Sequence, residues 1–251
     1  MKIISKINFH PLFYFFALLA IITGLFREFI IFMMIIFIHE IGHIFAGFIC
    51  NVKLQKVIFM PFGGLTIFSM PLNIEVYKEL FIATMGPVFQ IISFLILKNY
   101  LNSLSFYYYN IFILIFNLLP IYPLDGSKIL NCFLCYILNY RNSFNITFYT
   151  SFLFIMLIII LTIINKINFG FLIIIIFIGY KSLKEYLNFP SIYNKFLFER
   201  YINKYNFKKV KYVSNIYFFY KGKRHIIRNG KNLITEKEIL RKRFDFKRNV
   251  W

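Results

Sequence analysis

The stretch that decides the fold is IIFIHEIGHIFAG, residues 35–47, in which two histidines and a glutamate interrupt an otherwise apolar run. His39, Glu40 and His43 have the spacing H-E-x-x-H. A charged side chain at the centre of a membrane helix costs about 2.5–3.5 kcal/mol on insertion scales. If this run lies in a bilayer, its polar side chains must therefore make interactions that offset this cost.

The composition favours a membrane protein. The chain has 251 residues, of which 59% are hydrophobic, and its mean hydropathy is +0.67. Soluble domains are about 45–50% apolar, and a membrane helix needs about 17–25 mostly apolar residues. We therefore expect an all-α polytopic membrane protein with about six transmembrane helices in residues 1–187 and a small α/β cytoplasmic tail in residues 188–251. The six candidate spans are residues 9–26, 29–50, 77–97, 104–122, 146–164 and 169–187.

The distribution of basic residues predicts the orientation. The net charge is +19, and residues 188–251 hold 17 basic and 4 acidic side chains. Lys and Arg are also more frequent in the connections that would share a side with the N-terminus, which indicates that both termini are cytoplasmic. A basic tail beside membrane spans favours contact with anionic lipid over nucleic acid. We expect a multi-pass protein of the cell membrane that binds no nucleic acid.

Two stretches depart from simple spans. Residues 57–70 are apolar but too short to cross a membrane, and they include Gly63 and Gly64. They predict a hairpin that dips into the membrane face, with an ordinary apolar loop as the alternative. Residues 117–126, NLLPIYPLDG, hold two prolines and a glycine, which must break the fourth helix near its cytoplasmic end.

The polar residues of the spans predict a metal site. On a helix, positions i and i+4 lie on one face, so His39 and His43 can reach one metal ion. Glu40 projects from the edge of that face, where it can take a proton from a metal-bound water. Catalytic zinc typically has three protein ligands and an open position. Asp125 is the candidate third ligand, because it lies near the cytoplasmic end of another inward-running span.

These motifs together resemble the site-2 protease family of intramembrane zinc metalloproteases. H-E-x-x-H in an early span is followed by N-x-x-P-x-x-P-L-D-G in a later one, and the six-span layout is similar to the sporulation branch. In the second motif every position matches: Asn117, Pro120, Pro123, Leu124, Asp125 and Gly126. Gly86-Pro87 resembles a further Gly-Pro motif that many relatives follow with Asn three residues later, where this chain has Gln90.

The resemblance implies one zinc ion per chain and a role for each matched residue. Its implied zinc ligands are His39, His43 and Asp125, and the implied general base is Glu40. Gly63 and Gly64 match a re-entrant loop that presents the substrate as an added strand. The residues implied in substrate binding are Asn117, Gly63, Gly64 and Pro123.

The resemblance also implies a function. The expected activity is cleavage of a membrane-associated transcription-factor precursor, the sporulation sigma-K precursor, and membrane inhibitor proteins of the sporulation pathway are further implied partners. The alternative is a catalytically silent membrane scaffold or a metal-binding transporter. Metal binding alone does not need Glu40, so its presence argues against a catalytically silent protein.

The tail has its own pattern. In residues 210–243, alternating apolar residues around a glycine predict two strands, and Thr235 to Glu238 resembles a capping box that opens a helix. This order is similar to half of a CBS (cystathionine β-synthase) domain. We expect docking of substrate or of the membrane surface there, and a structural role for His225.

Overall fold

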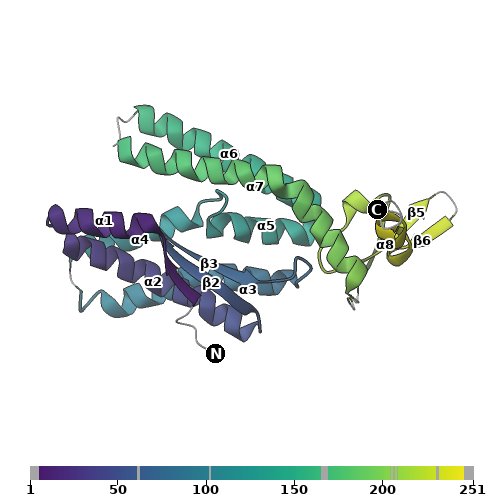
Figure 1. Ribbon diagram of the computed structural model, residues 1–251, viewed down its shortest axis with the longest axis horizontal. Helices are drawn as coiled ribbons and strands as arrows, with labels where there is room; N and C mark the ends of the chain where they lie inside the picture. The colour runs from purple at the N-terminus through teal and green to yellow at the C-terminus, as the bar shows by residue number, and fades with distance from the viewer. Residues whose placement is uncertain are drawn as a thin grey trace. The chain divides into compact units, whose positions relative to one another are not determined.

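The computed structural model shows a mostly helical chain with two small sheets (Figure 1). It divides into two compact units, which are described separately below. The first unit holds residues 1–70 and 80–119, and the second holds residues 71–79 and 120–251. The residues that the structure describes are 6–60, 63–101, 103–164, 169–203, 205, 207, 209–229 and 232–245.

The sheet of the first unit has the order β1-β2-β3. Its strands are β1 (Ile7–Phe9), β2 (Lys53–Met60) and β3 (Gly63–Ser69). β2 runs parallel to β1 and antiparallel to β3, with Val57 opposite both Ile7 and Thr66. A hairpin of two strands therefore fills most of the predicted stretch 57–70. Its depth in a membrane remains a prediction.

The helices of the first unit pack around this sheet. Four helices contribute: α1 (Pro11–Ile22), α2 (Phe26–Ile49), most of α3 (Val76–Leu97) and α4 (Leu104–Leu118). The core joins one face of α2 to β2 and α4, because apolar side chains at helical spacing on α2 meet alternate side chains of β2. Its buried members are Ile31, Ile35, Ile36, Val57, Phe59, Phe106 and Ile113.

The described residues of the second unit include three long helices that follow α4. They are α5 (Asp125–Ile137), α6 (Tyr140–Ile164) and α7 (Phe169–Ile202). α6 packs against α7 through aromatic rings, of which Phe144 and Phe189 stack with centroids 3.8 Å apart. The predicted domain boundary at residue 187 falls inside α7, which continues to Ile202. That boundary remains a prediction.

A three-stranded sheet and a helix end the described chain. β4 (Val210–Val213) runs parallel to β5 (Arg224–Asn229), which runs antiparallel to β6 (Asn232–Thr235). A 3₁₀ turn, η2 (Ile216–Phe218), lies between β4 and β5, and α8 (Glu236–Asp245) follows β6. The two strands predicted in the tail are found as β5 and β6 and the predicted helix as α8, and β4 adds a third strand.

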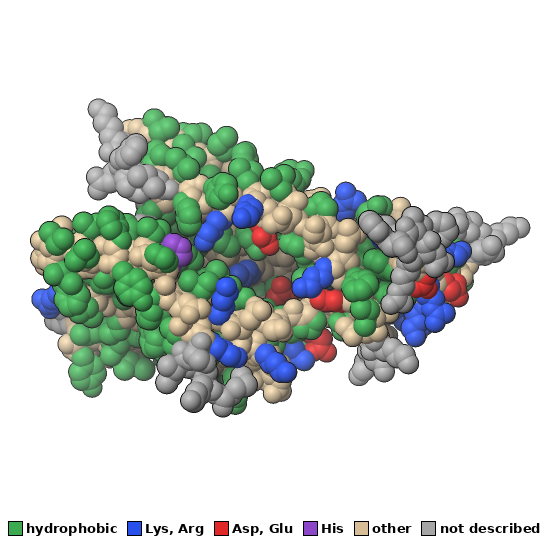
Figure 2. All heavy atoms as spheres, viewed as in Figure 1, with side chains coloured by type: hydrophobic (Ala, Val, Ile, Leu, Met, Phe, Trp, Pro, Cys, Tyr) green, Lys and Arg blue, Asp and Glu red, His purple; other side chains and the backbone are tan. Residues whose placement is uncertain are grey.

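The apolar surface is that of a membrane protein. Apolar side chains cover much of the visible face (Figure 2). α6, for example, leaves Leu153, Ile163 and Ile164 60% or more exposed. Within the described residues, three helices are long and apolar enough to cross a membrane, namely α2, α3 and α6. α1 and α4 are shorter apolar helices of 12 and 15 residues, so the count of six spans stays a prediction.

Candidate metal centre

The two histidines of H-E-x-x-H share one buried face of α2. His39 is 2% exposed and His43 is 5% exposed, and their Nε2 atoms lie 3.2 Å apart. Two Zn–N bonds of about 2.0–2.1 Å at a tetrahedral angle separate their nitrogens by about 3.3 Å. The spacing of the two imidazoles therefore fits two ligands of one zinc ion.

The hydrogen bonds on the other ring nitrogens make both Nε2 atoms available as ligands. Gln90 donates from Nε2 to the Asn110 carbonyl (2.9 Å), which turns its Oε1 toward His39 Nδ1 (3.0 Å). His43 Nδ1 lies 2.7 Å from the Ile82 carbonyl. Since each Nδ1 faces an acceptor, each must carry its proton there. The neutral rings then present lone pairs at Nε2, as metal-binding histidines do.

A glycine on α3 leaves room beside these lone pairs. A Cβ at Gly86 would lie 2.8 Å from His39 Nε2 and closer still to His43 Nε2. Gln90 and Ile82 lie one turn on either side of Gly86 along α3, and together these three residues face both imidazoles. The helix therefore orients the rings and, with glycine between Ile82 and Gln90, places no side chain of its own at Gly86 against their Nε2 atoms.

Glu40 contacts the hairpin instead of α3. Thr66 on β3 donates its hydroxyl hydrogen to Glu40 Oε2. The backbone of β3 also comes close, because a Cβ at Gly64 would lie 2.5 Å from both Cδ and Oε1 of the Glu40 carboxylate. Glu40 is 4% exposed, and its carboxylate is held beside the metal-binding face by β3, whereas α3 holds the imidazoles.

A small cavity brings several predicted site residues together within the first unit. It measures about 20 Å³ and is lined by His39, Glu40, Gly63, Gly64 and Asn117, along with apolar side chains of α2 and α4. About 10–15 Å³ is enough for one water molecule. The cavity therefore has room for a single water molecule among its lining residues, which include Glu40 and His39.

Pro123 and Asp125 belong to the second unit. The prolines end α4 at Leu118, and Asp125 is the first residue of the separate helix α5. Ser151 on α6 holds the residues between α4 and α5. Its hydroxyl donates to the Pro120 carbonyl (3.0 Å) and accepts from the Tyr122 amide (3.0 Å). Lys128 forms an ion pair with Asp125 at 2.9 Å.

Comparisons with known proteins indicate the family that the chain resembles. Residues 28–103, which include the H-E-x-x-H helix and α3, match the model of peptidase family M50. The chain is 27% identical to stage IV sporulation protein FB of Bacillus subtilis over 214 residues, covering 81% of this chain and 74% of that protein. These matches support the site-2 protease family, sporulation branch, and with it a membrane zinc metalloprotease.

Two matches from one archaeon extend this comparison. The zinc metalloprotease MJ0392 of Methanocaldococcus jannaschii is 29% identical over 117 residues, which are 42% of this chain and 34% of that protein. The solved site-2 protease from the same organism shares the fold with a TM-score of 0.57 at 22% identity, over 72% of this chain and 91% of that one.

Several contacts of the site could not be inferred from the sequence. The roles of Thr66 and Ile82 depend on contacts with α2 that no local pattern reveals. Ser151 is one of many small polar residues in an apolar helix, and nothing in its neighbourhood marks it. Gln90 was visible only as a departure from the family motif, and the structure gives it a contact with His39.

Proposed function

We propose that this chain is an intramembrane zinc endopeptidase that cleaves a membrane-associated precursor protein, the sporulation sigma-K precursor being the expected substrate. The observation that carries the proposal is the pair of oriented imidazoles with a carboxylate held beside them at a buried position. A silent scaffold or a transporter would not need that carboxylate, and the matches to a protease family support the enzyme.

The proposed ligand set is His39, His43 and Asp125. The two imidazoles supply the oriented nitrogens described above. Asp125 is assigned from its place in the P-L-D-G motif, and its position as the first residue of α5 supports the assignment, because the proline-rich break before it allows the carboxylate to turn toward a neighbouring span. Zinc held by these residues supplies Lewis-acid chemistry to the attacking water and to the scissile carbonyl.

Glu40 is the proposed general base. Its carboxylate accepts a proton from the attacking water and passes that proton to the leaving amine. The cavity beside it has room for this one water. Thr66 and the close backbone at Gly64 restrict the rotation of the Glu40 side chain, so the base is already oriented before substrate arrives.

The proposed substrate-binding residues are Asn117, Gly63, Gly64 and Pro123. In the described sheet, β3 pairs with β2 on one side only. A substrate segment added as a strand to the edge of β3 would satisfy the backbone groups that are freed when a helical substrate unwinds. Asn117 lines the same cavity as Glu40, where its amide would hold the substrate backbone or stabilise the oxyanion.

The proposed membrane arrangement has six spans, with both termini in the cytoplasm. The exposed apolar surfaces of α2, α3 and α6 support multiple crossings, and the basic tail supports the orientation.

Co-expression with the sigma-K precursor tests the function. Replacing Glu40 with Gln is expected to lower the rate of cleavage by about 10²–10⁴-fold, the usual contribution of a general base, while zinc content stays at one ion per chain. Glu28→Gln, at the first turn of the same helix, is the matched control and should cleave like wild type. Equal cleavage by Glu40→Gln and wild type would refute the mechanism.

A further inference from the structure

The C-terminal segment is docked through buried polar side chains onto residues 71–79. These residues connect β3 to the first turn of α3, and they belong to the same compact unit as the tail. Within the described chain, two cations carry the docking: Arg200 near the end of α7, and Lys221 in the turn before β5. Both are 5% exposed.

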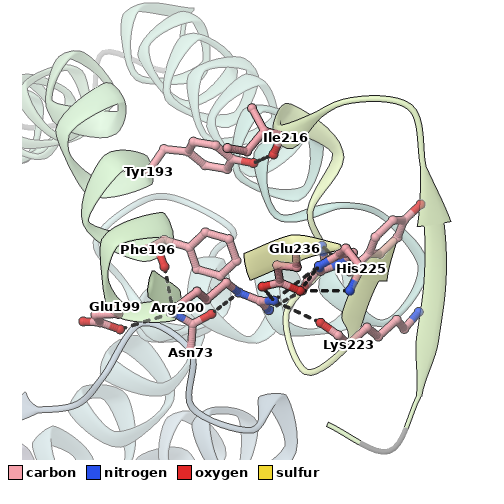
Figure 3. A network of polar contacts seen from close by, with 10 residues as sticks. Asn73, Tyr193, Phe196, Glu199, Arg200, Ile216, Lys223, His225 and Glu236 are labelled. Atoms are coloured by element: carbon pink, nitrogen blue, oxygen red, sulfur yellow. Dashed lines mark hydrogen bonds and ion pairs between the residues drawn. The ribbon is translucent and has the colours of Figure 1, made fainter. Parts of the chain in front are cut away.

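Arg200 links residues 71–79, called the connection below, to the sheet formed by β4, β5 and β6. Its Nε donates to the Asn73 side-chain oxygen at 2.5 Å. Its terminal nitrogens donate to the Tyr220 carbonyl at 2.7 Å, the Lys223 carbonyl at 3.0 Å and the Glu236 carboxylate at 2.8 Å. Figure 3 shows the guanidinium at the centre of this network, between Asn73 and Glu236. One side chain thus joins the connection, the tail turn and the start of α8.

Asn73 is held on its other side as well. Its Nδ2 donates to the Phe196 carbonyl of α7 at 2.9 Å and lies 3.3 Å from the Glu199 carboxylate. The same carboxylate accepts from the Leu72 backbone amide at 2.7 Å. Asn73 is 2% exposed, so both groups of its amide are satisfied inside the protein. The connection is therefore fixed to the last turns of α7 by its backbone and by a side chain.

Lys221 forms a second anchor at the first turn of α3. Its ammonium lies 2.6 Å from the Glu79 carboxylate and 4.9 Å from the centre of the Tyr140 ring. Burial alone would lower the pKa of Lys221, but Glu79 raises it above its usual value, so the ammonium stays charged. The Tyr140 amide at the start of α6 also donates to the Phe219 carbonyl at 2.9 Å.

Both ends of the anchored connection lead directly to residues of the metal centre. On one side is β3, whose Gly64 and Thr66 contact Glu40. On the other side is α3, where Ile82 lies one turn beyond Glu79 and accepts from His43. Residues 71–79 are therefore joined, through the chain itself, to the strand and the helix that orient the base and the imidazoles.

We propose that Arg200 and Lys221 are positioning residues for proteolysis, which hold the connection 71–79 and thereby keep β3 and α3 in the arrangement that catalysis needs. This inference rests on the proposed function. The C-terminal segment is then a working part of the protease and is more than a module appended to it.

Two variants of the full-length enzyme test the proposal. Asn73→Ala removes the acceptor for Arg200 Nε while leaving the contacts of Arg200 with the tail. Lys221→Met removes the ammonium and leaves Glu79 unpaired. Both are expected to lower kcat/KM for precursor cleavage at least tenfold, with zinc content unchanged, and to speed hydrogen exchange in residues 63–79. Lys221→Arg, which retains the charge, should recover most of the lost activity.

The matched control is Asn194→Ala. Asn194 on α7 accepts from Arg243 of α8 at 2.8 Å, so this variant removes a contact between helix and tail that does not involve the connection. It should stay within twofold of wild type. Wild-type kcat/KM in both test variants, or an equal loss in Asn194→Ala, would overturn the proposal. Failure of the wild type itself to cleave the precursor would instead overturn the proposed function.

Discussion

Replacing Gln90 with Leu is the sharpest test of how the imidazoles are oriented. The change keeps the buried volume of the side chain similar but removes the acceptor 3.0 Å from His39 Nδ1. The Nδ1 proton then loses its partner in a buried place, which costs about 1–3 kcal/mol. Loss of a hydrogen bond to a metal-binding histidine typically lowers metal affinity about 10–100-fold, equivalent to about 1.4–2.8 kcal/mol. The two estimates agree.

The assay is zinc affinity of the purified protein in detergent, measured by competition with a chromophoric chelator. Gln90→Leu should bind zinc at least tenfold more weakly than wild type. Gln90→Glu keeps an acceptor for His39 and should stay within about threefold. Ser93→Ala is the matched control on the same helix, because its hydroxyl donates to the Gln90 backbone carbonyl and contacts no imidazole. Wild-type zinc affinity in Gln90→Leu would refute the assignment of the His39 tautomer.

Three further outcomes are expected. Gly86→Ala should abolish zinc binding, because its Cβ would occupy the space beside both imidazole nitrogens; zinc content near one per chain would contradict this. Gly64→Ala should lower cleavage at least tenfold with normal zinc content, because its Cβ would displace Glu40; normal cleavage would show that the hairpin does not hold the base. The tail should become less protected from proteolysis as the pH falls from 7.5 to 5.5. Burial lowers the pKa of His225, so the stability that this residue contributes to the tail is complete above about pH 6.5 and is lost on acidification. The pKa of Glu236 is about 2, so its carboxylate stays charged throughout this pH range. Protection that does not change with pH would contradict the last expectation.

The network around His225 gives the physical reason for that pH dependence. His225 Nε2 accepts from the Tyr220 amide at 2.8 Å, and its Nδ1 lies 3.2 Å from Glu236 and 3.3 Å from Arg200. Burial is the largest cause of the lowered pKa, and the nearby charges of Arg200 and Lys223 add to it, while Glu236 opposes it. A proton on Nε2 would face the Tyr220 N–H directly.

Local patterns predicted the parts of the site that depend on one segment. The i, i+4 spacing of the two histidines placed both on one face of α2, and the prolines before Asp125 ended α4, as expected. The capping box at Thr235 likewise marked the start of α8, where its hydroxyl accepts from the Glu238 amide. In each case the interaction spans four residues or fewer, so a short stretch of the sequence shows both partners.

Contacts between distant segments could not be predicted in this way. β1 pairs with β2 about fifty residues later, and three residues are too few to show a strand pattern. Gln90 and His39 are separated by 51 residues, and Thr66 and Glu40 by 26. Arg200 appeared only as one of many basic residues in the tail, since its burial depends on Asn73, far away in the chain.

The size of the cavity beside Glu40 has a kinetic consequence. A space of about 20 Å³ accepts a water molecule but no peptide backbone, so a larger ligand needs the walls of the cavity to move apart. The hairpin is the element whose displacement would enlarge it, because Gly63 and Gly64 form one wall. A zinc-chelating hydroxamate should therefore inhibit with slow onset. Its association rate should level off at high inhibitor concentration, at the rate of opening itself.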